Sequence, residues 1–344
     1  MDNVAIRPAR ERADLFNEAG TRRGLATAII EKDFWVCGTL KRLFTLPGND
    51  NPGLGSSRVA LPCPGSITSF GDSPKTSICH STVAILAIQA TVIQKQRKAD
   101  QLIEDLRARV ERHIAQSLMP RLRSVIGAAL GSSAKSWELA IDSADPQTVS
   151  FRYLSSLAQA AYAGMAYVNP VVRLELGARG DPWPTGRHEI MSYVAEEFPD
   201  IFAEPTCSIV ALAVERTFWE KATILHAEYH RPDNRPIGDK QSRHYDDIAM
   251  LSESDYGDRA LGQLDLLARV AHHKSVFFRS GWAHYETAGP GTLRLTPSQE
   301  RLAELSADYA KMRPMMFDRA PPRFSHIMNT IADLERRINT GGTK

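Results

Sequence analysis

The stretch Glu215-Arg-Thr-Phe-Trp-Glu-Lys-Ala-Thr-Ile-Leu-His-Ala-Glu-Tyr-His230 contains no Gly or Pro and is dense in aromatic and ionisable side chains. Its apolar residues recur every three to four positions, which predicts a helix with one face packed against a core. The residues on that face are Phe218, Ala222, Leu225 and Tyr229. An apolar run before it, Ser208–Ala213, is expected to be a strand that leads directly into this central helix.

The charged residues of the expected helix do not all have partners within it. Arg216 and Glu220 lie four positions apart and share one face, where opposite charges can pair. Lys221 lies about 100° further round the helix, and the residue four positions before it is Thr217. A solvated side chain is the usual state of a lysine; the alternative is a role in a functional motif.

Three separated motifs resemble signatures of the AbiEii/AbiGii nucleotidyltransferase toxin family. Glu215-Arg-Thr-Phe-Trp-Glu-Lys221 is similar to one signature, and Glu31-Lys-Asp-Phe-Trp-Val36 is similar to the N-terminal one. Arg243-His-Tyr-Asp-Asp247 resembles a later Arg-His-Tyr-Tyr-Asp element, with Asp246 in place of the more usual Tyr. The resemblance covers residues 20–54 and about 95–335, and it is specific because the three motifs occur in the right order.

The resemblance implies a fold and an activity. The fold would be α+β, with a nucleotidyltransferase core similar to that of DNA polymerase β in residues 1–213 and a helical domain in residues 214–344. The activity would be Mg²⁺-dependent transfer of a nucleotide from an NTP to an RNA acceptor, such as tRNA, by a toxin of phage defence by abortive infection. A separately encoded antitoxin would counter it, without any implied physical contact.

The resemblance also implies roles for individual residues. Lys221 would hold phosphate, and Asp247 would orient or deprotonate the attacking hydroxyl, so these two are the expected catalytic residues. Five further residues are expected to bind substrate, namely Arg216, Glu220, Arg243, Lys274 and Arg279.

Residues 55–93 do not show the two motifs that the family resemblance predicts there. One is a Gly-Gly-Thr/Ser loop that cradles phosphate through backbone N–H groups. The other is Ser-Glu-Asp-Ile-Asp-Leu, whose aspartates would share one face of a strand and hold Mg²⁺. Neither is present, and no Asp-x-Asp occurs in the 344 residues.

Both motifs return when this segment is back-translated and read in a displaced frame. With suitable synonymous codons, Ser73–Cys79 reads Ser-Glu-Asp-Ile-Asp-Leu and Ser56–Pro64 reads Phe-Lys-Gly-Gly-Thr-Ser-Leu-Ser. We hypothesise that residues from about 55 to 93 are translated out of frame, between two compensating insertions or deletions. A coding DNA sequence incompatible with these codons would contradict the hypothesis.

A strand expected over Tyr167–Ala178 offers one further carboxylate. Val172, Leu174 and Leu176 would line one face of it, and Arg173 and Glu175 the other. Glu175 could be a third Mg²⁺ ligand, or it could form a surface pair with Arg173. The sequence favours neither.

The remaining pattern predicts a chain rich in helices. Lys32 and Asp33 are expected at the surface of the second helix, and Pro120 is expected to kink or end a long amphipathic helix that begins near residue 95. His226 and His230 lie four positions apart, but their spacing from Glu228 does not fit the metalloprotease motif, so we expect a packed pair. Expected helices are 8–19, 26–44, 193–197, 243–252, 257–273, 297–312 and 323–338, and further strands are Trp137–Ile141 and Thr148–Tyr153.

Composition limits the classes of protein to consider. Hydrophobic residues make up 43% and charged residues 24%, which is typical of a globular chain. The net charge of +2 does not by itself indicate nucleic-acid binding. The four cysteines form no C-x-x-C pair, and no segment resembles a signal peptide or a membrane span, so a cytoplasmic location is expected.

Three hypotheses follow from the sequence. The chain could be an active transferase, although it lacks the paired aspartates. It could be a non-catalytic relic that binds nucleotide or RNA through Lys221, Lys274 and Arg279. It could also fold poorly, because unpatterned sequence replaces a core strand and a phosphate loop.

Overall fold

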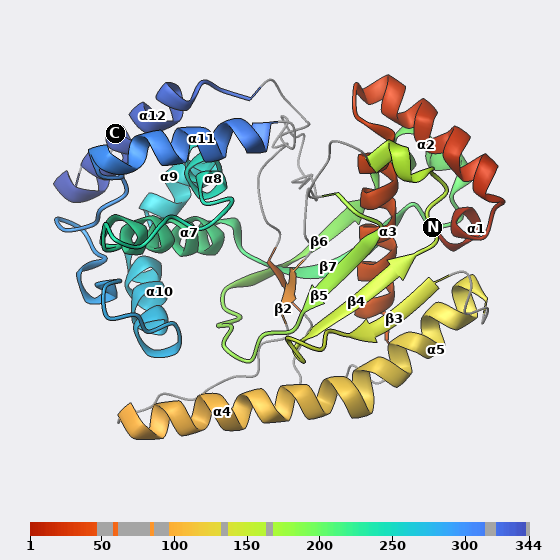
Figure 1. The fold of residues 1–344 in the computed structure, drawn as a ribbon, viewed down its shortest axis with the longest axis horizontal. Coiled ribbons are helices and arrows are strands. Elements are labelled where there is room, and N and C mark those ends of the chain that lie inside the picture. The colour runs from red at the N-terminus through yellow and green to blue at the C-terminus, as the bar shows by residue number, and fades with distance from the viewer. Residues whose placement is uncertain are drawn as a thin grey trace. The chain divides into compact units, whose positions relative to one another are not determined.

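The computed structural model describes residues 1–46, 58–60, 83–85, 96–131, 137–162, 168–313 and 321–341. The described residues up to Ala211 form one unit, and those from Leu212 onwards form a second. The first unit contains helices and two sheets and the second is helical, so the chain belongs to the α+β class, as predicted (Figure 1). Most of the segment to which the frame hypothesis applies lies outside the described residues.

The first unit contains two small sheets. One has the strand order β2-β1-β7-β6, in which β1 pairs antiparallel with β2 and parallel with β7. The other is the antiparallel sheet β3-β4-β5. The strands of the two sheets are β1 Arg58–Ala60, β2 Val83–Ile85, β3 Trp137–Ile141, β4 Thr148–Tyr153, β5 Val171–Glu175, β6 Thr185–Met191 and β7 Thr206–Leu212.

Helix α3 (Thr27–Phe44) packs against the three-stranded sheet and is buried on nearly every side (Figure 1). Its Trp35 ring stacks on that of Tyr153 from β4, with centroids 5.1 Å apart. The expectation that Asp33 is a surface residue is wrong, because the backbone N–H of Tyr193 donates to its carboxylate at 2.6 Å and only 3% of Asp33 is exposed. Lys32 is half-buried and donates to the carbonyls of Asn169 and Val171.

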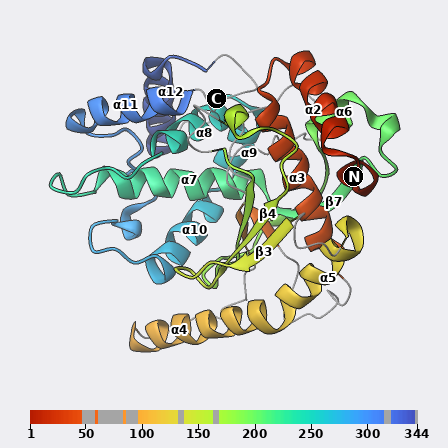
Figure 2. The same cartoon turned by 45° about the vertical axis from the view of Figure 1, so that its right-hand side comes forward.

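The long amphipathic helix continues beyond the proline that was expected to kink or end it. Helix α4 (Gln96–His113) passes through a π-helical segment (Ile114–Leu118) into α5 (Met119–Leu130) (Figure 2). Pro120 is the second residue of α5 and directly follows the π-helical segment, so the missing backbone N–H falls where the hydrogen-bond pattern of the helix already changes. The apolar stripe is buried as the spacing predicts, at Leu106, Val110, Ile114 and Leu118.

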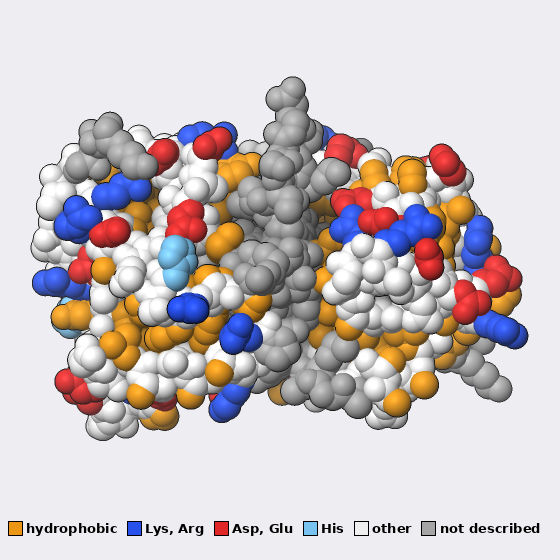
Figure 3. Space-filling view, turned by 90° about the horizontal axis from the view of Figure 1, so that it is seen from above, with side chains coloured by type: hydrophobic (Ala, Val, Ile, Leu, Met, Phe, Trp, Pro, Cys, Tyr) orange, Lys and Arg blue, Asp and Glu red, His pale blue; other side chains and the backbone are white. Residues whose placement is uncertain are grey.

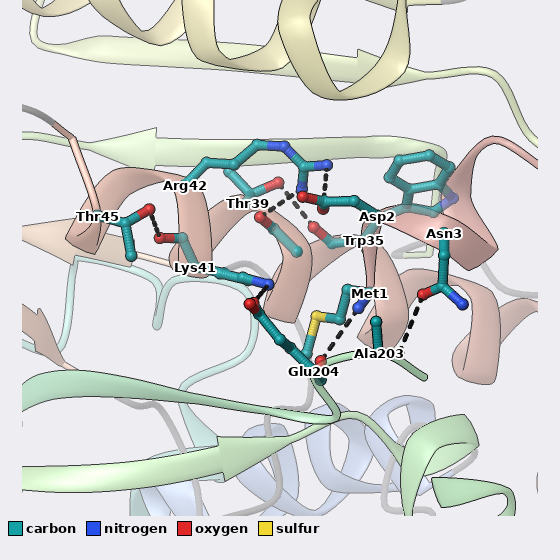
Figure 4. A network of polar contacts seen from close by, with 11 residues as sticks. Met1, Asp2, Asn3, Trp35, Thr39, Lys41, Arg42, Thr45, Ala203 and Glu204 are labelled. Atoms are coloured by element: carbon teal, nitrogen blue, oxygen red, sulfur yellow. Dashed lines mark hydrogen bonds and ion pairs between the residues drawn. The ribbon is translucent and has the colours of Figure 1, made fainter. Parts of the chain in front are cut away.

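The N-terminus of the chain is bonded to the rest of the first unit (Figure 4). Helices α1 (Asp2–Ala5) and α2 (Ala9–Arg23) precede α3. Arg42 on α3 donates to Asp2 at 2.8 Å, and Lys41 pairs with Glu204. The terminal ammonium donates to the Glu204 carbonyl at 3.1 Å, so residues far apart in sequence share one polar network.

The second unit is built around α7 (Val214–Tyr229), the central helix that the opening stretch predicts. It packs against α8, α9 and α10. A single helix was expected over residues 257–273, but the structure contains two, which are separated at Gly262 and Gln263. The other helices are α8 Ser242–Ser252, α9 Asp255–Leu261, α10 Leu264–Phe277, α11 Leu302–Met312 and α12 Phe324–Thr340, with α6 Tyr193–Glu197 in the first unit.

Charges of both signs are interspersed on the face shown in Figure 3, where acidic side chains lie beside basic ones in each unit. This agrees with the small net charge of +2. In the parts of the chain that the structure describes, no helix has the length and apolarity to cross a membrane.

Candidate functional site

Helices α7 and α8 bring together the two residues that were expected to be catalytic. The Lys221 ammonium donates a hydrogen bond to the Asp247 carboxylate, and the two side chains are only 8% and 2% exposed. The interpretation of Lys221 as a solvated lysine is therefore wrong. A buried charge normally has a partner of opposite sign, and here the partner is on the neighbouring helix.

The apolar residues around Lys221 fix the position of α7. Phe218 and Trp219 are fully buried and meet edge to face, with ring centroids 4.9 Å apart. The indole N–H of Trp219 donates to the carbonyl of Ala260 on α9 at 3.2 Å. Because these large rings allow little rotation of the helix, Lys221 is held facing α8.

A second group of charges continues from this pair along α7. Arg216 is completely buried and its Nε donates to the Glu220 carboxylate at 3.0 Å. Lys274, on α10, donates to the Glu220 backbone carbonyl at 2.7 Å. Burial, with the nearby positive charges of Arg216 and Lys221, lowers the pKa of Lys274 to about 8, against the opposing effect of Glu220. Four of the residues predicted from the sequence thus lie in one cluster with Asp247.

His244 belongs to the same cluster, although the sequence analysis did not single it out. It lies three residues before Asp247, so the two are neighbours on one side of α8. Only 8% of His244 is exposed, and its Nδ1 is buried without a hydrogen-bond partner in the described part of the chain. Burial, followed by the charges of Lys221, Arg243 and Lys274, places the pKa of His244 well below its usual value.

Three predicted site residues remain, namely Arg243, Arg279 and Glu175. Arg243 is half-buried at the start of α8 and acts on His244 electrostatically. Arg279 has an exposed side chain two residues after the end of α10, so its role stays a prediction. Glu175 lies on β5 in the first unit, half-buried, and Arg173 pairs with Asp142 at 3.3 Å rather than with Glu175.

The described residues do not form the carboxylate cluster that was expected to hold Mg²⁺. Among them, no three His, Cys, Asp or Glu side chains are grouped so that they could hold a metal ion. Glu175 therefore belongs to no such group, and its role as a Mg²⁺ ligand stays a prediction. The Ser56–Pro64 and Ser73–Cys79 segments, which would have to supply the missing motifs, lie mostly or wholly outside the described residues.

Two further polar groups have structural roles. The Glu31 carboxylate, fully buried on α3, accepts hydrogen bonds from Ser155, Ser156 and Tyr162 at 2.5 to 2.7 Å. Glu31 of the N-terminal motif thus connects α3 to the segment that follows β4.

His226 is also fully buried, and its two ring nitrogens are bonded to protein groups, as expected of a packed histidine.

Comparison with protein families identifies a match. The model of a family described as "Nucleotidyl transferase AbiEii toxin, Type IV TA system" matches residues 86–330, which is more than half of the chain. The matched segment contains the whole cluster of α7, α8 and α10, but it does not include the Glu31–Val36 motif. No curated protein matches the chain.

Proposed function

Because the chain belongs to the AbiEii family of nucleotidyl transferase toxins from type IV toxin–antitoxin systems, we propose that its second unit holds the NTP for nucleotide transfer to RNA. The proposed acceptor is tRNA. The family implies a separately encoded antitoxin as the partner that counters the toxin.

The observation that carries the proposal is the buried Lys221–Asp247 pair. A lysine in this position can exchange its carboxylate partner for a phosphate oxygen of the nucleotide, because both are anionic acceptors. The released Asp247 carboxylate is then available to accept the proton of the RNA hydroxyl as its oxygen bonds to the α-phosphorus and pyrophosphate leaves. Both steps gain from the dry surroundings, in which electrostatic interactions are strengthened.

We further propose that the chain, with residues 55–93 as they stand, transfers nucleotide poorly. Nucleotidyl transfer depends on cations that align the two oxygens of the displacement. The 344 residues contain no Asp-x-Asp, and among the described residues no three His, Cys, Asp or Glu side chains are grouped to hold a metal ion. No step of the reaction is therefore assigned to a metal in this chain, and NTP binding is the activity that the cluster supports best.

The test compares the chain as it stands with two variants and a control, using labelled NTPs, Mg²⁺ and bulk tRNA. The two variants are Lys221→Met and a chain in which residues 55–93 are encoded in the displaced frame. We expect the original chain to bind NTP, Lys221→Met to lose binding, and the frame-restored chain to transfer at least about a hundredfold faster than the original chain. Lys311→Met, at an exposed position of α11, is the matched control and should bind normally.

The outcomes separate the possible functions. Transfer by the original chain at the restored rate would contradict the proposed impairment. NTP binding without transfer, even by the restored chain, would favour a non-catalytic relic that binds nucleotide. If Lys221→Met binds NTP as tightly as the original chain, the proposed site is wrong.

A further inference from the structure

We propose that His244, Arg243 and Lys274 bind the polyphosphate of the nucleotide, and that His244 takes up a proton when the polyphosphate binds. The proposal rests on the function proposed for this unit and extends it. It names the part of the NTP that the cluster recognises and a residue that was not among the predicted site residues. It also predicts a linked change in protonation that a purely structural histidine would not show.

The first observation is that His244 is buried and that one of its ring nitrogens makes no hydrogen bond to the described residues. Its side chain is almost completely removed from solvent, and Nδ1 has no hydrogen-bond partner among the described residues. A buried polar atom without a partner costs about 1–3 kcal/mol, and native structures contain few of them. A ligand that accepts a hydrogen bond from Nδ1 would remove this cost.

The second observation concerns the charges around His244. Lys221 and Arg216 each have a carboxylate partner. In the described part of the chain, Lys274 donates only to a backbone carbonyl, and the buried Nε of Arg243 has no hydrogen-bond partner. Two cations without a bonded carboxylate therefore lie near an unsatisfied imidazole, which is an arrangement that favours an anion.

Several charged groups on the other elements packed against α8 are bonded to groups other than His244. Asp308 on α11 accepts from the backbone of Lys240 and Ser242. Glu253, which follows α8, pairs with His326 of α12 at 2.9 Å. The remaining charged pairs involving α9 are Arg259–Glu215 and Arg337–Asp258. The positive charges that lower the pKa of His244 are those of Lys221 from α7, Arg243 on its own helix and Lys274 from α10, and Asp247 lies on the same side of α8.

These observations indicate the class of ligand, and they indicate that ligand binding takes up a proton from solvent. Three donors on two helices suit an anion with several oxygens, which a polyphosphate supplies. In the free protein, burial and the neighbouring cations keep the pKa of His244 low, so the ring is neutral at pH 7. A bound anion opposes those cations and favours the charged form, so the pKa of His244 rises and a proton is taken up from solvent.

The experiment is calorimetric titration of the full chain with inorganic pyrophosphate at pH 7 in buffers of different ionisation enthalpy. We expect the original chain to take up more protons per bound pyrophosphate than His244→Asn, by close to one proton. Asn keeps a donor near the position of Nδ1 but has no proton to gain. Changes in the ionisation of pyrophosphate affect both proteins equally, so they cancel in the comparison. His326→Gln, at an exposed position, should behave as the original chain.

The affinity for pyrophosphate should also increase more steeply as the pH falls in the original chain than in His244→Asn, by up to about tenfold per pH unit. NMR of the imidazole in the unmutated protein gives a second measurement that does not depend on the folding of a variant. Pyrophosphate should convert His244 from its neutral to its charged form.

Several results would overturn the proposal. These are an imidazole that stays neutral in the complex, equal proton uptake by the original chain and His244→Asn, or pyrophosphate that displaces tRNA but not NTP. A chain that binds NTP but not pyrophosphate would reject this inference and leave the proposed function standing. A chain that binds neither would reject both.

Discussion

The burial of the Lys221–Asp247 pair leads to a prediction about stability that does not depend on catalysis. Both charges are almost entirely removed from solvent, so loss of the Asp247 charge removes the carboxylate to which the buried Lys221 ammonium donates. We expect Asp247→Asn to lower the free energy of unfolding by about 3–5 kcal/mol. Urea denaturation of the full chain at pH 7 measures this change.

The double variant and an exposed pair provide the controls. Lys221→Met combined with Asp247→Leu removes both charges, and its loss of stability should be much smaller than the sum of the two single losses. Asp333→Asn breaks an ion pair whose two side chains are both 68% exposed, so it should change the free energy by less than about 1 kcal/mol. Additive losses in the double variant would show that the two charges do not stabilise each other.

At the scale of secondary-structure elements, His226 connects α7 to segments far along the chain. Its Nδ1 accepts from the backbone N–H of Arg294 at 3.0 Å, so the proton of the neutral ring lies on Nε2, which donates to the carbonyl of His284 at 3.0 Å. Burial is the main cause that lowers the pKa of His226, and His230 and His284 add to it. A proton on Nδ1 would break the bond from Arg294.

The second unit should therefore lose stability in mild acid. Because the pKa of His226 is lower in the folded than in the unfolded chain, its contribution is complete above about pH 6.5 and is lost as the pH falls through the folded value. We expect the free energy of unfolding to decrease between pH 7 and pH 5.5, and His226→Gln to reduce this slope. Urea denaturation at each pH, with His326→Gln as control, tests it. An unchanged slope in His226→Gln would assign the acid sensitivity to other groups.

The periodicity of apolar residues predicted the helices and strands that have a single clear apolar face. It failed where contacts between residues distant in sequence determine the structure. Strands Trp137–Ile141 and Thr148–Tyr153 have the predicted bounds. Strand β6 was missed because Gly186 follows Pro184 at its start and its residues scarcely alternate in burial. The burial of Asp33 depends on the backbone of Tyr193, which is distant in sequence.

The candidate site was also predictable from the sequence only in part. The sequence showed no residue of opposite charge four positions before Lys221, and the family resemblance implied that Lys221 and Asp247 serve the same reaction. That the two residues pair with each other follows only from the packing of α7 on α8. His244 could have been found from its spacing of three residues from Asp247, but its unsatisfied nitrogen is visible only in the structure.

For the whole molecule, the central question is whether the chain folds with residues 55–93 as they stand. The described core of the second unit comes from residues after Leu212, including the fully buried Trp219, Leu267, Leu293 and Ile331. None of these side chains belongs to the anomalous segment. We therefore predict that this described core forms whichever frame encodes residues 55–93.

Hydrogen exchange tests this directly in the original and frame-restored chains. We expect the backbone amides of α7 and α8 to be protected to the same degree in both, because amides in a packed core exchange only through opening of that core. If α7 were protected only in the restored chain, the original chain would be a poorly folded product, and nucleotide binding by its second unit would fail for that reason alone. Equal protection together with slow nucleotide transfer would instead locate the defect in the chemistry that residues 55–93 should supply. Measuring both properties on the same two proteins therefore separates a disarmed toxin from an unstable one.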